Sequence, residues 1–173
     1  MNNVAAQIPQ QWARNTVIDT VNVPVKDFWP IFHNLNLEEV AAKERYKRLP
    51  KIVKTTPVEG DFSAVGHSRR VHFDNDKTLL ESILVYDDPN DFVYELTEVE
   101  IALKRFAKRA RGWFNFTATP GGKTRIEWTY GFDQQSFLAK WIIKAYIKST
   151  HRHFMNDAMQ EIKQQSEAAY TAK

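Results

Sequence analysis

The chain has 173 residues and a mass of 20.2 kDa, which favours a single domain. A hydrophobic fraction of 43% beside 26% charged residues excludes wholesale disorder, and a net charge of +3 is too small for a dedicated nucleic-acid-binding protein. The absence of cysteine excludes disulfides, thiolate metal ligands and a cysteine nucleophile. With 11 Phe, 6 Tyr and 5 Trp, the chain must bury large rings or use them to line a cavity.

The N-terminal segment, residues 1–14, carries no long apolar stretch, so we expect a flexible arm there and no signal peptide. No apolar run in the sequence approaches the ~20 residues needed to span a bilayer. These patterns predict a cytoplasmic protein with a single domain over residues 15–168.

The first predicted elements are a strand and two short helices. Alternating valines share one face of a strand over residues 15–23, which Pro24 ends. The segments VKDFWPIFHN and LNLEEVAAKERY then predict two short helices, the second with Asn36 as its N-cap.

A series of strands and one long helix follow. Short turns rich in Gly, Asp, Asn and Pro separate the strands, which favours antiparallel neighbours. From residue 135 to 165 there is neither Pro nor Gly, and an apolar row including Leu138, Trp141, Ile142 and Met155 predicts an amphipathic helix about 45 Å long. A sheet and a long helix bury one face against each other, so the fold class is α+β, with room for a cavity between the layers. The predicted strands are residues 51–59, 67–74, 78–87, 91–103, 109–119 and 123–132.

Four segments carry motifs in a fixed order. They are VIDTVNVPVKDFWPIFHN, with Pro24, Phe28 and Trp29; VGHSRRVHF, with Gly66, Arg69 and Val71; LLESILVYDDPNDFVYEL, with Glu81, Asp87, Asp88, Pro89 and Tyr94; and TPGGKTRIEWTYGF, with Gly121, Gly122, Thr124, Arg125, Trp128 and Phe132. Their order and spacing over residues 15–165 resemble the START-related helix-grip superfamily (SRPBCC), in its polyketide cyclase/dehydratase and lipid-transport-like branch. The resemblance implies a curved antiparallel β-sheet of about six to seven strands wrapped on a long C-terminal α-helix, with two short helices after the first strand.

Two charged residues on neighbouring strands are the leading polar candidates. Residues 69 and 81 are equidistant from the turn at 74–76, which predicts that Arg69 and Glu81 lie opposite each other. The resemblance places both positions toward the cavity. Two interpretations stay open: the pair orients the polar end of an apolar ligand, or it is a structural ion pair between strands.

Strand alternation indicates which other side chains enter the cavity. On strand 109–119 the sequence leaves open whether Trp113 and Asn115 or Phe114 and Phe116 face inward. The resulting sets are mostly apolar with a few polar members, as in a small-molecule pocket. The candidate ligand-binding residues are Arg69, Val71, Phe73, Glu81, Ile83, Tyr94, Leu96, Trp113, Asn115, Trp128 and Trp141.

The resulting hypothesis is binding or transport of a hydrophobic small molecule (a lipid, an aromatic or a polyketide-like compound) between the sheet and the C-terminal helix. The alternative is a polyketide cyclase/dehydratase-like enzyme that uses Arg69, Glu81 or Tyr94 as acid/base groups, and no catalytic residue is assigned. His151 and His153 diverge on a helix, and the sequence has no P-loop or dinucleotide fingerprint. We therefore expect no metal and no cofactor, and the oligomeric state is left open.

Two basic segments remain, residues 43–54 and 104–111. One interpretation of KRFAKRAR (104–111) is peripheral contact with an anionic membrane, with Phe106 at an exposed hairpin tip among the cations. The other is a solvated hairpin whose charge is balanced by Glu95, Glu98 and Glu100. A nucleic-acid partner is not expected from either segment.

Overall fold

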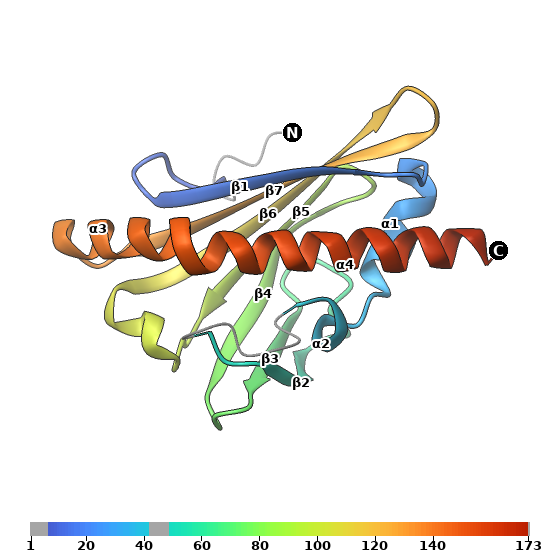
Figure 1. Cartoon of the computed structure of the whole chain (residues 1–173). Helices are drawn as coiled ribbons and strands as arrows, with labels where there is room; N and C mark the ends of the chain where they lie inside the picture. Colours follow the sequence, from blue (N-terminus) through green and yellow to red (C-terminus); the bar gives the residue numbers. More distant parts are fainter. Residues whose placement is uncertain (1–6, 42–48, 173) are drawn as a thin grey trace.

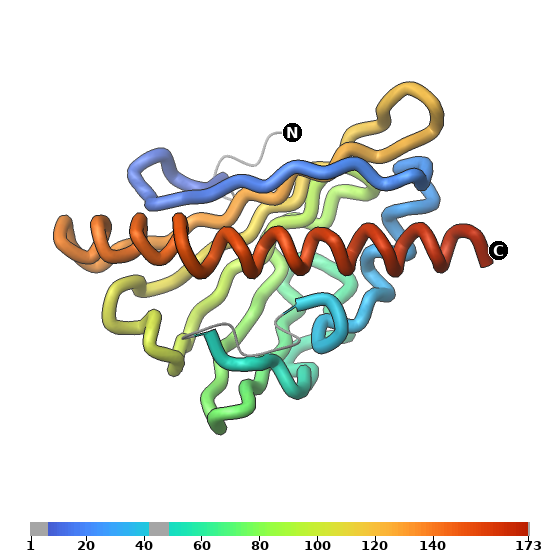
Figure 2. The backbone as a smooth tube through the Cα atoms, in the orientation of Figure 1, coloured from blue at the N-terminus to red at the C-terminus, as the bar shows by residue number. Residues whose placement is uncertain are grey.

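The computed structural model describes residues 7–41 and 49–172. Over this part of the chain, a seven-stranded sheet curves around one long C-terminal helix (Figures 1 and 2). The strand order is β1-β7-β6-β5-β4-β3-β2, and all neighbours are antiparallel. The α+β class and the helix-grip architecture expected from the sequence are confirmed.

The strands follow the predicted segments closely, with one exception. The strand predicted over 91–103 is too long, because Glu98 takes a positive φ of 48° that breaks the extended backbone. A 3-10 helix, η2 (Ala102–Arg105), then leads into the next strand. The strands are β1 (Ala13–Val21), β2 (Ile52–Glu59), β3 (Ser68–Phe73), β4 (Thr78–Asp87), β5 (Asp91–Thr97), β6 (Ala107–Thr119) and β7 (Lys123–Gln134).

Two short helices follow β1, as predicted. Helix α1 (Val25–His33) begins directly after Pro24 and buries Phe28 and Trp29. Helix α2 (Leu37–Val40) is capped by Asn36, whose side chain accepts a hydrogen bond from the Glu38 backbone N–H at 3.1 Å. The remainder of the predicted second helix lies outside the described residues after Ala41.

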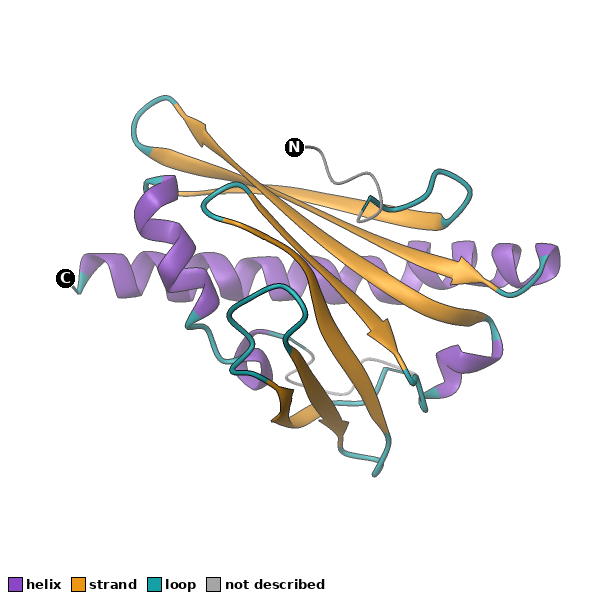
Figure 3. Ribbon diagram, turned by 180° about the vertical axis from the view of Figure 1, so that it is seen from behind, coloured by secondary structure: helices purple, strands orange, loops and turns teal. Residues whose placement is uncertain are grey.

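The C-terminal helix crosses the whole concave face of the sheet, and Figure 3 shows it passing behind the strands. It consists of α3 (Phe137–Tyr146), a π-helical turn η3 (Ile147–His151) and α4 (Arg152–Thr171). Ser136 caps its start by accepting from the Ala139 N–H at 3.1 Å. The helix extends six residues past the predicted end at 165, and the π turn interrupts the single α-helix that the sequence predicts.

The segment before β1 packs on the outer face of the sheet. Ile8 and Trp12 are each only 5% exposed, and a Cβ at Gly131 would lie 2.4 Å from the Ile8 side chain, so glycine makes room for Ile8 there. Strand β1 already begins at Ala13. The predicted arm over residues 1–14 therefore differs from the structure over 7–14, because apolar side chains in this segment are buried. Residues 1–6 lie outside the described part of the chain.

Candidate functional site

A cavity of about 170 Å³ lies between the concave face of the sheet and the C-terminal helix. This volume far exceeds the roughly 10–15 Å³ that one water molecule needs. Its wall is largely apolar and comes from α1, α2, the strands, the loops between them and the C-terminal helix. The polar side chains that border it are His33, Arg69, Glu81, Tyr94, Tyr130, Tyr146 and His151.

Most of the sequence-predicted residues border this cavity. Ile83 does not, because its side chain, 1% exposed, is packed into the core that supports the wall. Strand alternation found the correct face of β3, β4, β5 and β7. The predicted residues that line the cavity are Arg69, Val71, Phe73, Glu81, Tyr94, Leu96 and Trp128.

Trp113 and Asn115, two of the candidates, lie on the opposite face of β6. The Trp113 indole and the Asn115 amide both donate to the Asp91 carboxylate, at 2.7 and 2.9 Å. The alternate residues face inward: Phe114 lines the cavity and Phe116 is buried. The choice of Trp113 and Asn115 was wrong because the aromatic side chains of α1 contact the phenylalanine face of this strand.

Trp141 is likewise not a cavity residue. Its side chain is 60% exposed on the outer side of α3. The row of this helix that faces the sheet contains Ala139, Ile143 and Ile147, all buried. The prediction thus selected the exposed one of two apolar rows on this helix.

Arg69 and Glu81 are paired in register on β3 and β4, and the predicted contact is confirmed. The Arg69 Nε donates to the Glu81 carboxylate at 2.6 Å, and the side chains are 20% and 7% exposed. The guanidinium also lies 4.0 Å from the centre of the Phe62 ring. The cavity wall therefore holds a shielded ion pair inside an otherwise apolar surface.

Two histidines border the cavity that no sequence motif indicated. His33, near Trp29 and Tyr86, has its pKa lowered to about 4 by burial and by the positive charge of Arg69. Burial lowers the pKa of His151, in the π turn, to about 3. Because both pKa values lie well below 7, the two imidazole rings are neutral at pH 7. His33 Nε2 and His151 Nδ1 have no hydrogen-bond partner among the described residues.

Three tyrosines complete the polar part of the wall. Burial raises the pKa of Tyr94, Tyr130 and Tyr146, so their phenols stay neutral hydrogen-bonding groups. Tyr94 lies directly over Gly112 of β6, where a Cβ would be 2.1 Å from the tyrosine Cζ. The absence of a side chain at Gly112 thus leaves the space in which the Tyr94 ring lies over the neighbouring strand.

Substituting Gly112 with alanine is expected to lower the free energy of unfolding by about 1–3 kcal/mol, because the new methyl group overlaps the Tyr94 ring. Urea denaturation of the variant and the wild type measures the loss. In a Tyr94→Leu background the same substitution should cost much less, since the shorter side chain can vacate the contact. Equal losses in both backgrounds would show that Tyr94 is not the cause.

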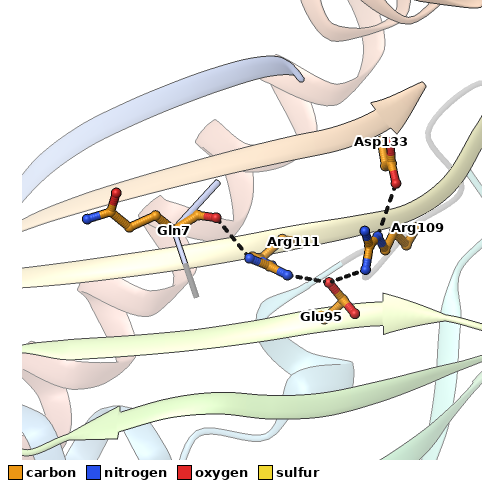
Figure 4. A network of polar contacts seen from close by, with 5 residues as sticks. All are labelled: Gln7, Glu95, Arg109, Arg111 and Asp133. Carbon is orange, nitrogen blue, oxygen red and sulfur yellow. Dashed lines mark hydrogen bonds and ion pairs between the residues drawn. The ribbon is translucent and has the colours of Figure 1, made fainter. Parts of the chain in front are cut away.

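The basic segment 104–111 does not form the predicted tip. Phe106 is half-buried against the core rather than exposed. Arg111 is buried and pairs with Glu95 at 2.6 Å, while Arg109 contacts Glu95 at 3.6 Å and Asp133 at 3.0 Å (Figure 4). Arg111 also donates to the backbone oxygen of Gln7 at 2.8 Å, so two of these cations hold the N-terminal segment and the strands together.

The glutamates expected to balance the charge of segment 104–111 do so only in part. Of the glutamates expected to balance segment 104–111, Glu95 does so, whereas Glu98 pairs with Arg70 at 2.6 Å and Glu100 accepts from the Thr78 backbone N–H at 2.8 Å. The first half of the basic segment 43–54 lies outside the described residues, which omit 42–48.

Within residues 7–41 and 49–172, no group of three or more His, Asp or Glu side chains is arranged to hold a metal ion. In the same part of the chain, no helix combines the length and apolar character that crossing a membrane requires.

Comparisons with known proteins agree with this geometry. The chain has the fold of norcoclaurine synthase from Thalictrum flavum, solved as a point mutant with a transition-state analogue (TM-score 0.67, 14% identity, 95% of this chain and 99% of that one). It is also similar to XoxI from Bacillus cereus (TM-score 0.62, 14% identity, 88% and 94%) and to Ara h 8.0201 (TM-score 0.58, 15% identity, 94% and 99%). None of the curated protein sequences matches it.

The family is established by the sequence itself. A family model described as polyketide cyclase / dehydrase and lipid transport matches residues 14–167, which include all of the sheet except Ala13 and nearly all of the C-terminal helix. The resemblance of the four motifs is therefore confirmed, and the cavity lies within the matched region. The chain belongs to the polyketide cyclase/dehydrase and lipid transport family.

Proposed function

We propose that this protein binds a hydrophobic small molecule (a lipid, an aromatic or a polyketide-like compound) in the cavity between the sheet and the C-terminal helix. The observation that carries the proposal is the cavity itself, about 170 Å³ with a largely apolar wall. Family membership supports a hydrophobic ligand-binding fold. An apolar ligand gains free energy by leaving water for such a wall.

The polar groups of the wall provide orientation. The Arg69 Nε is engaged by Glu81, and the two terminal nitrogens of Arg69 have no hydrogen bond to another described residue. They are suited to a carbonyl or carboxylate oxygen of the ligand, because guanidinium bonds to such acceptors are charge-assisted. The neutral imidazoles and phenols accept or donate single hydrogen bonds without adding charge.

A cavity-filling substitution tests the proposal. Ala158 is buried in α4 and borders the cavity, so Ala158→Phe places a ring where the ligand would lie. Binding of the fluorescent apolar probe 1-anilinonaphthalene-8-sulfonate to the folded variant is expected to weaken at least about tenfold, since the ring removes the apolar surface that the probe would contact. Native mass spectrometry of freshly purified wild-type protein should also show a bound small molecule that the variant lacks.

Ala168→Phe is the matched control, because Ala168 is exposed on the same helix. It should bind the probe like the wild type. Circular dichroism establishes that both variants are folded, and Ala158→Leu gives a milder filling if the phenylalanine is not tolerated. Unchanged probe binding in a folded Ala158 variant would contradict the proposal.

A second candidate is acid–base catalysis in the same cavity, as in a cyclase or dehydratase. It is supported by the position of Arg69, Glu81 and Tyr94 on the cavity wall. However, burial raises the pKa of Tyr94 well above its ordinary value, which makes the phenol a weak acid at pH 7. The low pKa of about 4 at His33 makes that imidazole a weak base. Binding therefore has the stronger support, and recovery of the bound molecule unchanged after incubation would favour it.

A further inference from the structure

The outer side of α3 exposes a cluster of large apolar side chains. Phe137, Leu138, Trp141 and Ile142 are 73%, 74%, 60% and 48% exposed. They form two neighbouring rows, because residues four apart stack on one helix face, and the Phe137 and Trp141 rings touch edge to face at 6.2 Å. A contiguous exposed patch of this kind marks an interaction surface. We call these four residues the α3 patch.

Basic residues border the α3 patch on one side. Lys140, Lys144, Lys148 and Arg152 recur every fourth residue, between the exposed rows and the row that faces the sheet. The Lys144 ammonium lies 5.1 Å from the Trp141 ring centre. The sequence has no acidic residue between Asp133 and Asp157. The patch is therefore apolar at its centre and positive along its edge.

The start of η2–β6 adds further cations beside the beginning of α3. Gln135 joins the two segments, donating from its side chain to the Lys104 backbone oxygen at 2.7 Å and from its backbone to the Phe106 oxygen at 2.9 Å. Lys104 and Arg105 are exposed there. Two cations of segment 104–111, for which the sequence suggested a membrane contact, thus lie beside α3. The exposed apolar side chains next to them belong to α3, because Phe106 packs against the core.

We propose that the α3 patch docks this protein on the surface of a membrane containing anionic lipids. Aromatic side chains such as Trp141 and Phe137 favour the boundary between headgroups and acyl chains, and lysines beside them keep their charge among the headgroups. Each cation near a negatively charged surface adds attraction. A second copy of this chain is disfavoured as the occupant, because facing patches would bring like-charged rows together.

The same helix connects the α3 patch to the cavity. Tyr146 at the end of α3 and His151 in the π turn border the cavity, about one to four turns after the exposed side chains. Docking through α3 therefore places one end of the cavity wall near the membrane surface. The inference goes beyond the proposed ligand binding and stands on exposed residues that do not line the cavity.

Vesicle co-sedimentation of the full chain tests the docking. Binding is expected to vesicles of phosphatidylcholine with phosphatidylserine, to be weaker with phosphatidylcholine alone, and to decrease with added salt. All five tryptophans lie in the described part of the chain, and Trp141, at 60%, is the most exposed of them, so its emission should shift to the blue on binding. Trp141→Phe should abolish that shift while retaining most of the binding.

Two double variants separate the apolar and charged contributions. Leu138→Ser with Ile142→Ser, and separately Lys144→Glu with Lys148→Glu, should each weaken partitioning onto anionic vesicles at least about tenfold. Ile18→Ser is the matched control, because Ile18 is a 56% exposed apolar residue of β1 that is not part of the α3 patch. It should bind vesicles like the wild type.

Three results would overturn the proposal. They are no binding to anionic vesicles at low salt, equal binding to both vesicle types, and wild-type binding by the folded Leu138 and Ile142 double variant. Sedimentation equilibrium without lipid tests the alternative occupant, which is a second copy of this chain. A dimer that this double variant abolishes, together with no vesicle binding, would assign the patch to a second copy of the chain.

Discussion

Replacing Glu81 with alanine is expected to lower the free energy of unfolding by about 3–5 kcal/mol, because it leaves the Arg69 guanidinium in the cavity wall without its counter-charge. The Glu81 side chain is 7% exposed and accepts from Arg69 at 2.6 Å, so little water can replace the lost carboxylate. Chemical denaturation of the wild type and the variant at neutral pH measures the difference.

A surface pair provides the comparison. Arg125 and Glu127 on β7 lie 2.8 Å apart with side chains 35% and 38% exposed, and Glu127→Ala should cost less than about 1 kcal/mol. Replacing both members of the buried pair, as Arg69→Met with Glu81→Leu, should recover most of the loss, because no unpaired charge remains. A Glu81→Ala loss no larger than that of Glu127→Ala would reduce the pair to a surface contact.

Acidification from pH 6 to pH 4 is expected to lower the free energy of unfolding by about 2–3 kcal/mol through His151 alone. Its pKa is about 3 in the folded protein, against 6.5 as the ordinary value, so the unfolded chain binds the proton more readily. The contribution of the neutral His151 to the free energy of unfolding is therefore fully present above pH 6.5. It falls by about 1.4 kcal/mol per pH unit as the pH drops toward 3. His33, with a pKa of about 4, acts in the same direction over a narrower range.

The contribution of His151 can be isolated with His151→Phe. Carboxylates titrate alike in both proteins, so the difference between their free energies of unfolding removes them. This difference should change across pH 6 to 4 in favour of the phenylalanine variant, whatever constant offset the new ring adds through packing. A difference that stays constant over this range would mean that the imidazole is solvated or hydrogen-bonded in the folded state.

The parts of the fold that the sequence predicted correctly are those specified by local signals. The turn at 74–76 fixes a hairpin, and hairpin symmetry then places Arg69 opposite Glu81 without any other information. Asn36 caps α2 through a contact within two residues. Turn residues and alternation similarly located the strands and the inner faces of most of them.

The errors arose where two faces look alike in sequence. On β6, the inner and outer rows both carry aromatic side chains, and only the rings of α1 decide that Phe114 faces inward instead of Trp113. On α3, Trp141 and Ile143 belong to apolar rows of similar strength, so periodicity alone does not choose between them. The histidines of the cavity wall carry no spacing motif, because only the tertiary fold brings His33 and His151 to the same cavity.

The π turn changes which side of the C-terminal helix faces the sheet. Its buried row repeats every four residues: Ala139, Ile143, Ile147, His151, Met155 and Met159. An α-helix advances about 100° per residue, so five four-residue steps would drift by about 200° and carry the methionines to the far side. The wider turn takes up one extra residue and removes about half of that drift.

The extra residue in η3 therefore sets the rotation of α4 relative to α3. This rotation determines which side chains of the two helices face the cavity and which are exposed. Deleting Ser149 would leave every neighbouring side-chain type unchanged, yet rotate α4 against α3 by about 100°. The α3 patch and the cavity could then no longer both keep their present orientation toward the sheet. The extra residue of the π turn thus gives one continuous helix two differently oriented faces, the exposed α3 patch before the turn and the cavity wall of α4 after it.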